Sequence, residues 1–448
     1  MTVQMIILRD NSTHQVTPQE IDAYLSLQSV ANRKISELLN ENGDNLLIYP
    51  HSFHQCEDEM NDQPLFSLQT SWKEKQCTKS VLTTGNIVGF IGVNGQSVSI
   101  QSRFTEHADK DFFLHYMLDK VLGINIVNLP HGTSSDRIFN FLLFLFPKFL
   151  NDALTQGVYK EYRRNEYNDA NIRGPIDVSR QLKTNTPFNG RIAYRTREFS
   201  HDNNVTELIR HTIDYISKTR FGNALLENDS ETHANVSRII AATPRYNRQE
   251  RDKIIRNNLK IISHPYYSRY TPLRKLCLRI LRHEKIKYGS NDNEIFGILF
   301  DVSWLWEEYL ATIFIPQGFS HPNNRKKIGR IYLAKANRLD RYPDFYREQD
   351  SIIIDAKYKR SINRDDIHQI ISYMYRLKGH AGMFIKPRDE EDTQKNEYEL
   401  LGYGEDCGAR LRIESFPISS ESRSYDNFKA EMMKQENIFA SKYRLKEL

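Results

Sequence analysis

The chain has 448 residues, more than one folded core usually takes, and its 39% hydrophobic and 11% aromatic content is enough for two or three cores. A charged fraction of 27% is typical of a soluble protein and argues against global disorder. The formal net charge of +5 is compatible with nucleic-acid binding but does not by itself demonstrate it.

No segment of the sequence is typical of a secreted or membrane protein. The N-terminus lacks the basic start and long apolar core of a signal peptide. The longest apolar run, residues 138–150, contains Pro147 and Lys148 and is shorter than the about 20 residues that cross a bilayer as a helix. We therefore expect a cytoplasmic protein without a membrane span.

The cysteines bear on redox state and on metal binding. None of them has C-x-x-C spacing, which suits reduced thiols better than a disulfide framework: Cys56, Cys77, Cys277 and Cys407. One alternative is a zinc site formed by His51, His54, Cys56 and Cys77. Structural zinc sites usually pair their ligands at both ends, however, and Cys77 stands alone. Ordinary loop residues are the better interpretation.

The first 110 residues combine a helix with short strands. Thr17 as N-cap, Pro18 at the first helical position and Glu20 three residues after the cap predict the start of a helix, which should end within residues 40–43. Three β-like runs follow, at 45–50, 80–93 and 96–104, and an Asn-Gly turn joins the last two. Residues 1–110 are predicted to be a small α+β module.

Residues 111–290 are predicted to form a mostly helical middle domain. Apolar residues recur with helical spacing in four segments, 111–123, 136–157, 203–219 and 271–288. A polar segment, 164–182, contains a break at Gly174 and Pro175, and 189–200 has the pattern of a strand.

The end of this middle region is basic. Thirteen Lys and Arg side chains lie between Arg245 and Lys287, against three acidic ones. The segment also carries aromatic residues that could stack on a base: Tyr246, Tyr266, Tyr267 and Tyr270. Contact with DNA phosphates and an ordinary solvated helical face are both open interpretations.

Residues 291–448 alternate between helix and strand. We expect one amphipathic helix over 293–314, strands over 327–345, 351–359, 381–387 and 409–418, a helix over 364–379 and a solvated, charged helix at the C-terminus. This order is typical of a small α/β nuclease core.

The candidate catalytic residues lie at the end of the strand SIIIDAKYK. Its three consecutive isoleucines predict a strand covered on both faces. Because strand side chains alternate, Asp355 and Lys357 project to one face. If the polar REQDS segment reverses the chain symmetrically between residues 349 and 350, Asp344 lies opposite Asp355. Two carboxylates this close favour a shared hard cation, Mg²⁺ or in its place Mn²⁺.

This arrangement suits phosphodiester hydrolysis, which needs an activated water and positive charge at the pentavalent transition state. Lys357 would orient that water and Lys359 would hold the DNA backbone. A third carboxylate ligand would come from the preceding helix, as Glu307 rather than Glu308. Gln369 and Tyr373 are four apart on the following helix and would contact the lysine or a phosphate.

The bare pattern of Pro-Asp followed by Asp-x-Lys is degenerate, and a solvated hairpin with an Asp355–Lys357 ion pair also explains it. Three further features favour the nuclease: the triple-isoleucine strand, the helix with Glu307 and the helix with Gln369 and Tyr373. Trp304 and Trp306 are interpreted as core packing.

Several segments together resemble the McrC family, the nuclease subunits of McrBC-type, modification-dependent restriction systems. NIVGFIGVNGQSVSIQSRF is similar to that family's N-terminal hairpin. IRGPIDVSRQL and REFSHDNNVTELIRHTI are similar to its middle region. LFDVSWLWEEYL, PDF, IDAKYK and HQIISY look like its nuclease core. The resemblance covers about three-quarters of the chain. It departs from the family where QSRF replaces a hairpin ending in Pro-Lys.

The resemblance implies a C-terminal PD-(D/E)xK endonuclease domain over 291–448, with Asp344 and Asp355 as metal ligands, Lys357 as catalytic lysine and Glu307 as a further ligand. It also implies that residues 1–110 dock on a McrB-like AAA+ GTPase and that the chain enters an oligomer through this motor. The sequence has no P-loop of its own, in agreement with a separate motor. A non-cleaving activator of the motor and a stand-alone repair nuclease are the alternatives.

Overall fold

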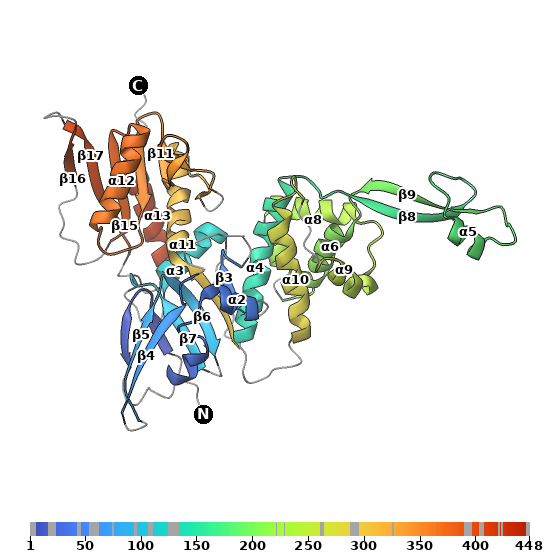
Figure 1. Ribbon diagram of the computed structural model, residues 1–448, viewed down its shortest axis with the longest axis horizontal. Coiled ribbons are helices and arrows are strands. Elements are labelled where there is room, and N and C mark those ends of the chain that lie inside the picture. The colour runs from blue at the N-terminus through green and yellow to red at the C-terminus, as the bar shows by residue number, and fades with distance from the viewer. Residues whose placement is uncertain are drawn as a thin grey trace. The chain divides into compact units, whose positions relative to one another are not determined.

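The computed structural model (Figure 1) describes residues 6–444 apart from 17–23, 43–45, 53–61, 74–75, 94–95, 106–110, 124–133, 221, 228, 260–263, 287–294, 325–326, 389–396, 403–406, 420–421 and 423. It divides into two compact units, residues 1–138 with 291–448 and residues 139–290. The chain is a mixed α+β, multidomain protein, as predicted. The first and third predicted segments lie in one compact unit; their separation into the domains 1–110, 111–290 and 291–448 stays a prediction.

A five-stranded sheet in the first unit combines strands from both ends of the chain. Its order is β1 (Ile6–Arg9), β7 (Gln96–Gln101), β6 (Ile87–Val93), β10 (Phe296–Asp301) and β3 (Leu46–Tyr49). The strands expected at 45–50 and 96–104 are confirmed, and β6 and β7 pair antiparallel as expected. The turn at 94–95 lies outside the described residues.

The prediction of one helix over 293–314 is wrong. Its described first half is strand β10, which pairs parallel with β3 and antiparallel with β6, and only its second half is helix α11 (Val302–Phe314). The Asp301 side chain sets the boundary, because it accepts the backbone N–H groups of Ser303 and Trp304, each at 3.1 Å, and so caps the helix. A short apolar run does not reveal by periodicity whether it is strand or helix.

A second sheet in this part of the chain contains β2 (Thr13–Val16), β5 (Gln76–Thr84) and β4 (Phe66–Lys73). The helix expected from Thr17 to residues 40–43 is interrupted: a 3₁₀ turn, η1 (Ser26–Ser29), is followed by α2 (Ile35–Asn42). Between them Asn32 has φ +61° and its side chain bonds both backbone groups of Leu68, at 2.9 and 3.1 Å. The predicted cap, Thr17, and the zinc candidates His54 and Cys56 lie outside the described residues.

The helical elements of this unit include α3 (Phe112–Leu122), α11, η5 (Ile315–Gln317) and α13 (Tyr425–Ser441), and α11 packs against the other three and against strand β10. The prediction that the terminal helix is simply solvated is wrong, because α13 buries one face that includes Phe428 and Met432. Its buried Glu436 accepts hydrogen bonds from the hydroxyls of Tyr116, at 2.8 Å, and Tyr309, at 2.9 Å. Burying a carboxylate requires such donors, and they come from elements far away in sequence.

The C-terminal sheet has the order β13 (Phe345–Arg347), β14 (Ile352–Ala356), β15 (Ala381–Pro387), β17 (Cys407–Phe416) and β16 (Glu397–Leu401). β14, β15 and β17 are parallel, and the edge strands β13 and β16 are antiparallel to their neighbours. Helix α12 (Arg364–Leu377) connects β14 to β15, and β11 (Ile331–Ala334) pairs with β12 (Arg338–Arg341). The strands and the helix predicted from sequence are therefore present here.

The second unit is mostly helical, as predicted. Its helices are α4 (Ser134–Leu154), which begins before the unit boundary, α6 (Asn204–Ile216), α7 (Gly222–Leu226), α8 (Ser230–Ala242), α9 (Arg251–Asn257) and α10 (Tyr270–Ile286), with a 3₁₀ turn η4 (Arg248–Glu250). The long antiparallel ribbon of β8 (Glu161–Asp169) and β9 (Ile192–Ser200) projects from these helices and carries α5 (Val178–Thr184) near its tip (Figure 1). Among the described residues, no helix has the length and apolar character to cross a membrane.

Candidate active site at the end of strand β14

The hairpin formed by β13 and β14 has the register expected from the sequence. Phe345 pairs with Ile354 and Tyr346 with Ile353, so the same register continued by one residue places Asp344 opposite Asp355. The backbone N–H of Ala356 donates a hydrogen bond of 2.8 Å to Asp344 Oδ2. The carboxylates of Asp344 and Asp355 therefore lie opposite each other at the open end of the hairpin, away from its turn.

Asp355 and Lys357 lie together on one side of the strand end, as the alternation of side chains predicted. Asp355 is only 1% exposed, and its Oδ2 lies 2.7 Å from Lys357 Nζ. The ammonium of Lys357 also donates to Gln369 Oε1 at 2.9 Å. A half-buried lysine is thus held between the carboxylate and an amide on α12.

Gln369 and Tyr373 belong to the same group of contacts. They are one helical turn apart on α12, and Gln369 Nε2 donates to the Tyr373 hydroxyl at 2.5 Å. That hydroxyl donates in turn to the backbone oxygen of Tyr342 at 3.3 Å. A chain of hydrogen bonds therefore runs from Lys357 across α12 to the segment before Asp344.

Lys359 pairs with an acidic residue of α12, and its contact with the DNA backbone stays a prediction. Its ammonium lies 2.7 Å from both carboxylate oxygens of Asp366, which also caps α12 together with Asn363. Asp366 lies 3.7 Å from Lys357 as well. Asp366 was not predicted as a site residue, although Asn363 followed by Asp366 is a recognisable capping pattern.

His321 is a further neighbour of the site that sequence reasoning missed. Its Nδ1 lies 3.0 Å from the backbone oxygen of Asp344, and its ring stacks on Phe345 with 4.7 Å between centroids. It lies 3.9 Å from Glu307 Oε1 and 3.7 Å from Glu308 Oε1. No local motif marks this histidine, which lies 23 residues before Asp344 in the sequence. A β-bridge between Ser320 and Tyr346 places it beside the site.

The charges of the site perturb one another strongly. Burial, followed by the charges of Glu307 and Asp355, raises the pKa of Asp344 well above its ordinary value. Burial raises the pKa of Asp355 too, although the ammonium of Lys357 opposes this shift. Burial alone would lower the pKa of Lys357, but the carboxylates of Asp355 and Asp344 outweigh it and the net shift is upward. The site concentrates negative charge in a buried position, which a bound cation would relieve.

The donor set fits a hard divalent cation. Asp355 Oδ2 is buried and, among the described residues, accepts no hydrogen bond beyond its ion pair with Lys357. Mg²⁺ is commonly held by one or two carboxylates while waters and substrate phosphates complete its shell. Within the described part of the chain, no three His, Cys, Asp or Glu side chains stand in a metal-binding arrangement. Asp344 and Asp355 offer two carboxylates for such a cation, and their role as metal ligands stays a prediction, as does that of Glu307.

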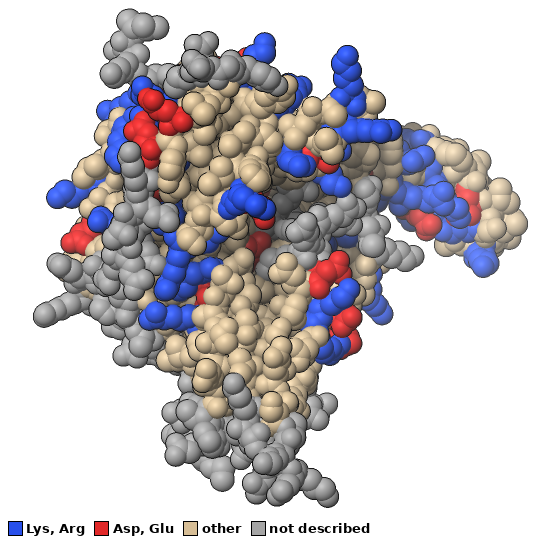
Figure 2. Space-filling view, turned by 60° about the vertical axis from the view of Figure 1, so that its left-hand side comes forward, with Lys and Arg blue, Asp and Glu red and all other residues tan. Residues whose placement is uncertain are grey.

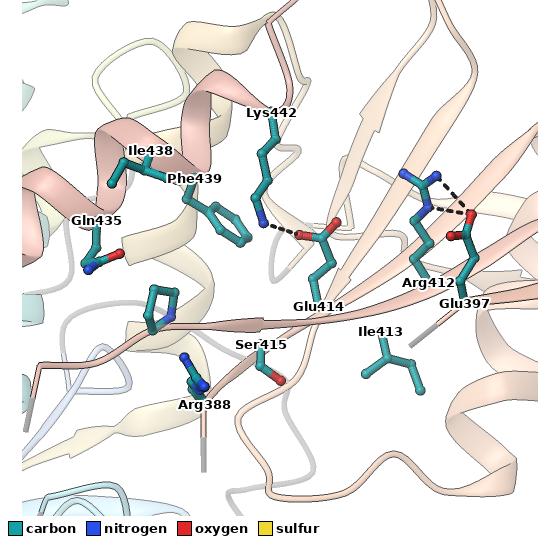
Figure 3. Close-up of a pocket in the computed structure, with 11 residues that line it drawn as sticks. Arg388, Glu397, Arg412, Ile413, Glu414, Ser415, Gln435, Ile438, Phe439 and Lys442 are labelled. Carbon is teal, nitrogen blue, oxygen red and sulfur yellow. Dashed lines mark hydrogen bonds and ion pairs between the residues drawn. The ribbon is translucent and has the colours of Figure 1, made fainter. Parts of the chain in front are cut away.

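A cavity of about 500 Å³ adjoins this group on the side of α12. Its wall includes Gln369 and Tyr373, which belong to the hydrogen-bond chain that starts at Lys357, together with Arg341 and His368. A different and larger cavity, of about 650 Å³, lies between β17 and α13 (Figure 3). None of the predicted site residues lines that larger cavity.

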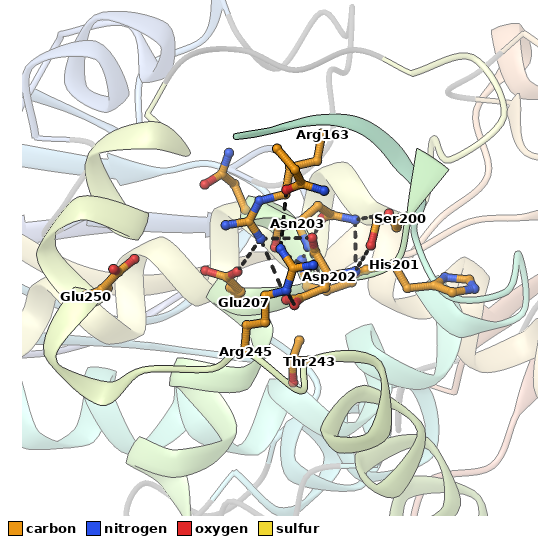
Figure 4. A network of polar contacts seen from close by, with 12 residues as sticks. Arg163, Ser200, His201, Asp202, Asn203, Glu207, Thr243, Arg245 and Glu250 are labelled. Carbon is orange, nitrogen blue, oxygen red and sulfur yellow. Dashed lines mark hydrogen bonds and ion pairs between the residues drawn. The ribbon is translucent and has the colours of Figure 1, made fainter. Parts of the chain in front are cut away.

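In the second unit, the root of the β8–β9 ribbon is fixed to α6 by a buried polar network (Figure 4). Arg163 on β8 donates to the backbone oxygen of Asp202 and to Glu207 Oε1, both at 3.0 Å. Asn203 caps α6 and its amide donates to the backbone oxygens of Ser200 and His201, each at 3.1 Å. Apart from Arg163, these residues lie within the REFSHDNNVTELIRHTI segment that carried part of the family resemblance.

The basic segment in this unit is partly paired within itself and with its neighbours. Arg248 pairs with Asp214 at 2.5 Å and Lys253 with Glu250 at 3.0 Å. Tyr270 is 3% exposed and packs in the interior. Lys and Arg side chains are scattered over the face shown in Figure 2, with acidic side chains among them. DNA contact by this segment stays a prediction, and Tyr270 is too buried to stack on a base.

A family model described as McrBC 5-methylcytosine restriction system component matches residues 82–387. The chain belongs to this family, and it is a component of a restriction system of the McrBC type. No curated protein matches the sequence.

Two solved structures from Thermococcus gammatolerans are similar. One is a chain of the refined half-complex from the tetradecameric assembly of McrB AAA+ hexamers with bound McrC, at 12% identity, with a TM-score of 0.43 and coverage of 96% of this chain and 100% of that chain. The other is a chain of the McrBC complex, at 15% identity, with a TM-score of 0.31 and coverage of 70% and 88%.

Proposed function

We propose that this chain is the DNA-cleaving subunit of its restriction system, a Mg²⁺-dependent endonuclease with a PD-(D/E)xK core. The observation that carries the proposal is the group formed by Asp344, Asp355 and Lys357. Two carboxylates are brought together by strand pairing, and an ammonium lies 2.7 Å from one of them. Family membership supports the same assignment.

Asp344 and Asp355 would hold the cation, and Glu307 is proposed as an additional ligand. A bound Mg²⁺ would lower the pKa of a water and neutralise phosphate charge. Lys357 would orient the attacking water and stabilise negative charge on the phosphate, because its ammonium is fixed by Asp355 and Gln369. Lys359, which pairs with Asp366, would hold the DNA backbone.

We further propose a McrB-like AAA+ GTPase as partner, with the N-terminal part of the chain as the docking module and the oligomer formed through the motor. Family membership and the lack of a P-loop in the sequence support this division of labour. Cleavage of DNA inside a cell implies a cytoplasmic location. A non-cleaving activator and a stand-alone repair nuclease are the competing functions.

The test uses the full chain with its co-purified AAA+ partner, Mg²⁺ and plasmid DNA with or without 5-methylcytosine. Asp355→Ala and Lys357→Ala should lose cleavage by at least about 1,000-fold while stimulation of NTP hydrolysis persists. Glu348→Ala, an exposed acidic residue in the turn of the same hairpin, is the matched control and should cleave normally.

Three outcomes would contradict the proposal. Cleavage that survives in both variants would remove the proposed site. Stimulation of the motor by a wild-type chain that never cuts would favour the activator, and full cleavage without any motor would favour the stand-alone nuclease.

A further inference from the structure

The segment Gln101–Phe104, which reads QSRF, is where the sequence departs from the family hairpin, and in the structure it contacts the residue next to Lys357. We propose that Tyr358 is a positioning residue for Lys357, through which this segment fixes the end of the catalytic strand. The inference rests on the proposed function of Lys357 and goes beyond it, because it makes a residue of the N-terminal part necessary for the geometry of the active site.

The contact between the two parts is direct and buried. Ser102 Oγ and the Tyr358 hydroxyl lie 2.6 Å apart, and Ser102 is 0% and Tyr358 5% exposed. The Tyr358 ring packs edge-on against Phe104, with centroids 5.0 Å apart, and the Arg103 guanidinium lies 5.1 Å from the ring centroid. Three consecutive residues of one segment therefore surround a single tyrosine.

The segment is held in place by partners in its own part of the chain. Arg103 Nε and a terminal nitrogen donate to Asp10 Oδ2 at 2.9 and 2.6 Å, and the same terminal nitrogen donates to Asn86 Oδ1 at 2.5 Å. The backbone N–H of Ser102 donates to Asp111 Oδ2 at 2.5 Å. Asp10 Oδ1 also accepts the backbone N–H of Arg103 at 2.6 Å, and charge-assisted hydrogen bonds of this kind are about twice as strong as neutral ones. The contacts that fix Ser102 and Arg103, which surround Tyr358, therefore do not involve Tyr358 itself.

On the other side, the backbone that carries Lys357 has little regular support. Strand β14 ends at Ala356, and Lys357 itself keeps one backbone hydrogen bond, from its N–H to Ile385 O at 2.9 Å. Two residues beyond Tyr358, the oxygen of Arg360 accepts from Lys386 Nζ at 2.6 Å. Between these two points two side chains hold the backbone, that of Lys359, which pairs with Asp366, and that of Tyr358, which points away from the face that carries Lys357.

Loss of the Tyr358 contact should therefore displace Lys357 without removing any group from the active site. A misplacement on the order of 1 Å can cost about 100-fold in rate, so partial loosening should cost about ten-fold. Any movement of the N-terminal sheet at Gln101–Phe104 would reach Lys357 by the same route.

The test is Tyr358→Phe in the full chain, which removes one hydroxyl and keeps the ring. We expect kcat for DNA cleavage to fall about ten-fold with little change in KM, because the proposed role of Lys357 is to orient the attacking water and to stabilise charge that develops in the transition state. Hydrogen exchange at the Lys357 amide should accelerate about ten-fold. Ser102→Ala removes the same bond, so the double variant should be no worse in kcat than the worse single variant.

Tyr116→Phe is the matched control: it removes a hydroxyl that donates to buried Glu436 at 2.8 Å, a hydrogen bond in which neither strand β14 nor Lys357 takes part. It should lower thermal stability like Tyr358→Phe but leave kcat and the exchange at Lys357 unchanged. Equal kcat losses in both variants, or unchanged exchange at Lys357 in Tyr358→Phe, would overturn the inference. A wild-type chain that does not cleave would instead refute the proposed function, and the exchange measurement would still decide the positioning role.

Discussion

Replacing Asp344 by Asn should stabilise the metal-free protein while abolishing its response to Mg²⁺. The structure places this carboxylate opposite Asp355 and within the field of Glu307, and its raised pKa shows that its charged form is disfavoured in the fold. An amide of the same shape can still accept the hydrogen bond from Ala356 N–H, which is 2.8 Å long in the structure. The change therefore removes charge and leaves the packing intact.

The magnitude follows from the charges. Two carboxylates about 5 Å apart repel by about 3 kcal/mol at an effective dielectric constant of about 20, and attraction to Lys357 cancels part of this. A net gain of about 1 to 2 kcal/mol should raise the melting temperature by about 2 to 3 °C for a unit of this size.

The assay is thermal unfolding in EDTA and in excess Mg²⁺. The wild-type melting temperature should rise on addition of Mg²⁺, because the cation binds only the folded state, whereas that of Asp344→Asn should not change. Glu348→Gln, an exposed acidic residue in the turn of the hairpin, is the control that should behave as wild type in both conditions. The reasoning is refuted if Asp344→Asn melts below wild type in EDTA or keeps the full response to Mg²⁺.

Two further predictions concern stability away from the site. Glu436→Ala strands the hydroxyls of Tyr116 and Tyr309 and should lower the free energy of unfolding by about 2 to 4 kcal/mol in urea titrations, whereas Glu436→Gln, which keeps an acceptor, should cost less. His211 is 3% exposed, and burial lowers its pKa from 6.5 to about 4. Because it folds neutral but is protonated in the unfolded chain below pH 6.5, its contribution is complete above that pH, and about 3 kcal/mol should be lost between pH 6.5 and about 4. Unfolding titrations of wild type and His211→Gln across this range should differ in slope, and parallel curves would contradict the assignment.

Much of the candidate site could be predicted because it depends on local periodicity. Asp355 and Lys357 share a face because strand side chains alternate, and Gln369 and Tyr373 meet because they are one helical turn apart. The hairpin register also followed from the sequence, since a symmetric turn leaves one pairing for Asp344. Covalent spacing decides each of these contacts.

Other features depend on partners that are distant in the chain. The apolar run at Phe296–Asp301 has no periodicity that separates strand from helix, and pairing with β3 and β6 makes it a strand. His321 lies beside Asp344 because a β-bridge joins the loop residue Ser320 to Tyr346 on β13. The buried face of α13 is likewise defined only by the elements that pack against it.

The sequence by itself therefore determined which residues lie together in the candidate site and in the hydrogen-bond chain beside it, because spacings of two and four residues are properties of a single strand or helix. Only the tertiary structure decided what surrounds them. Ser102 and Tyr358 are 256 residues apart and no local pattern relates them, yet burial of both hydroxyls forces them to pair.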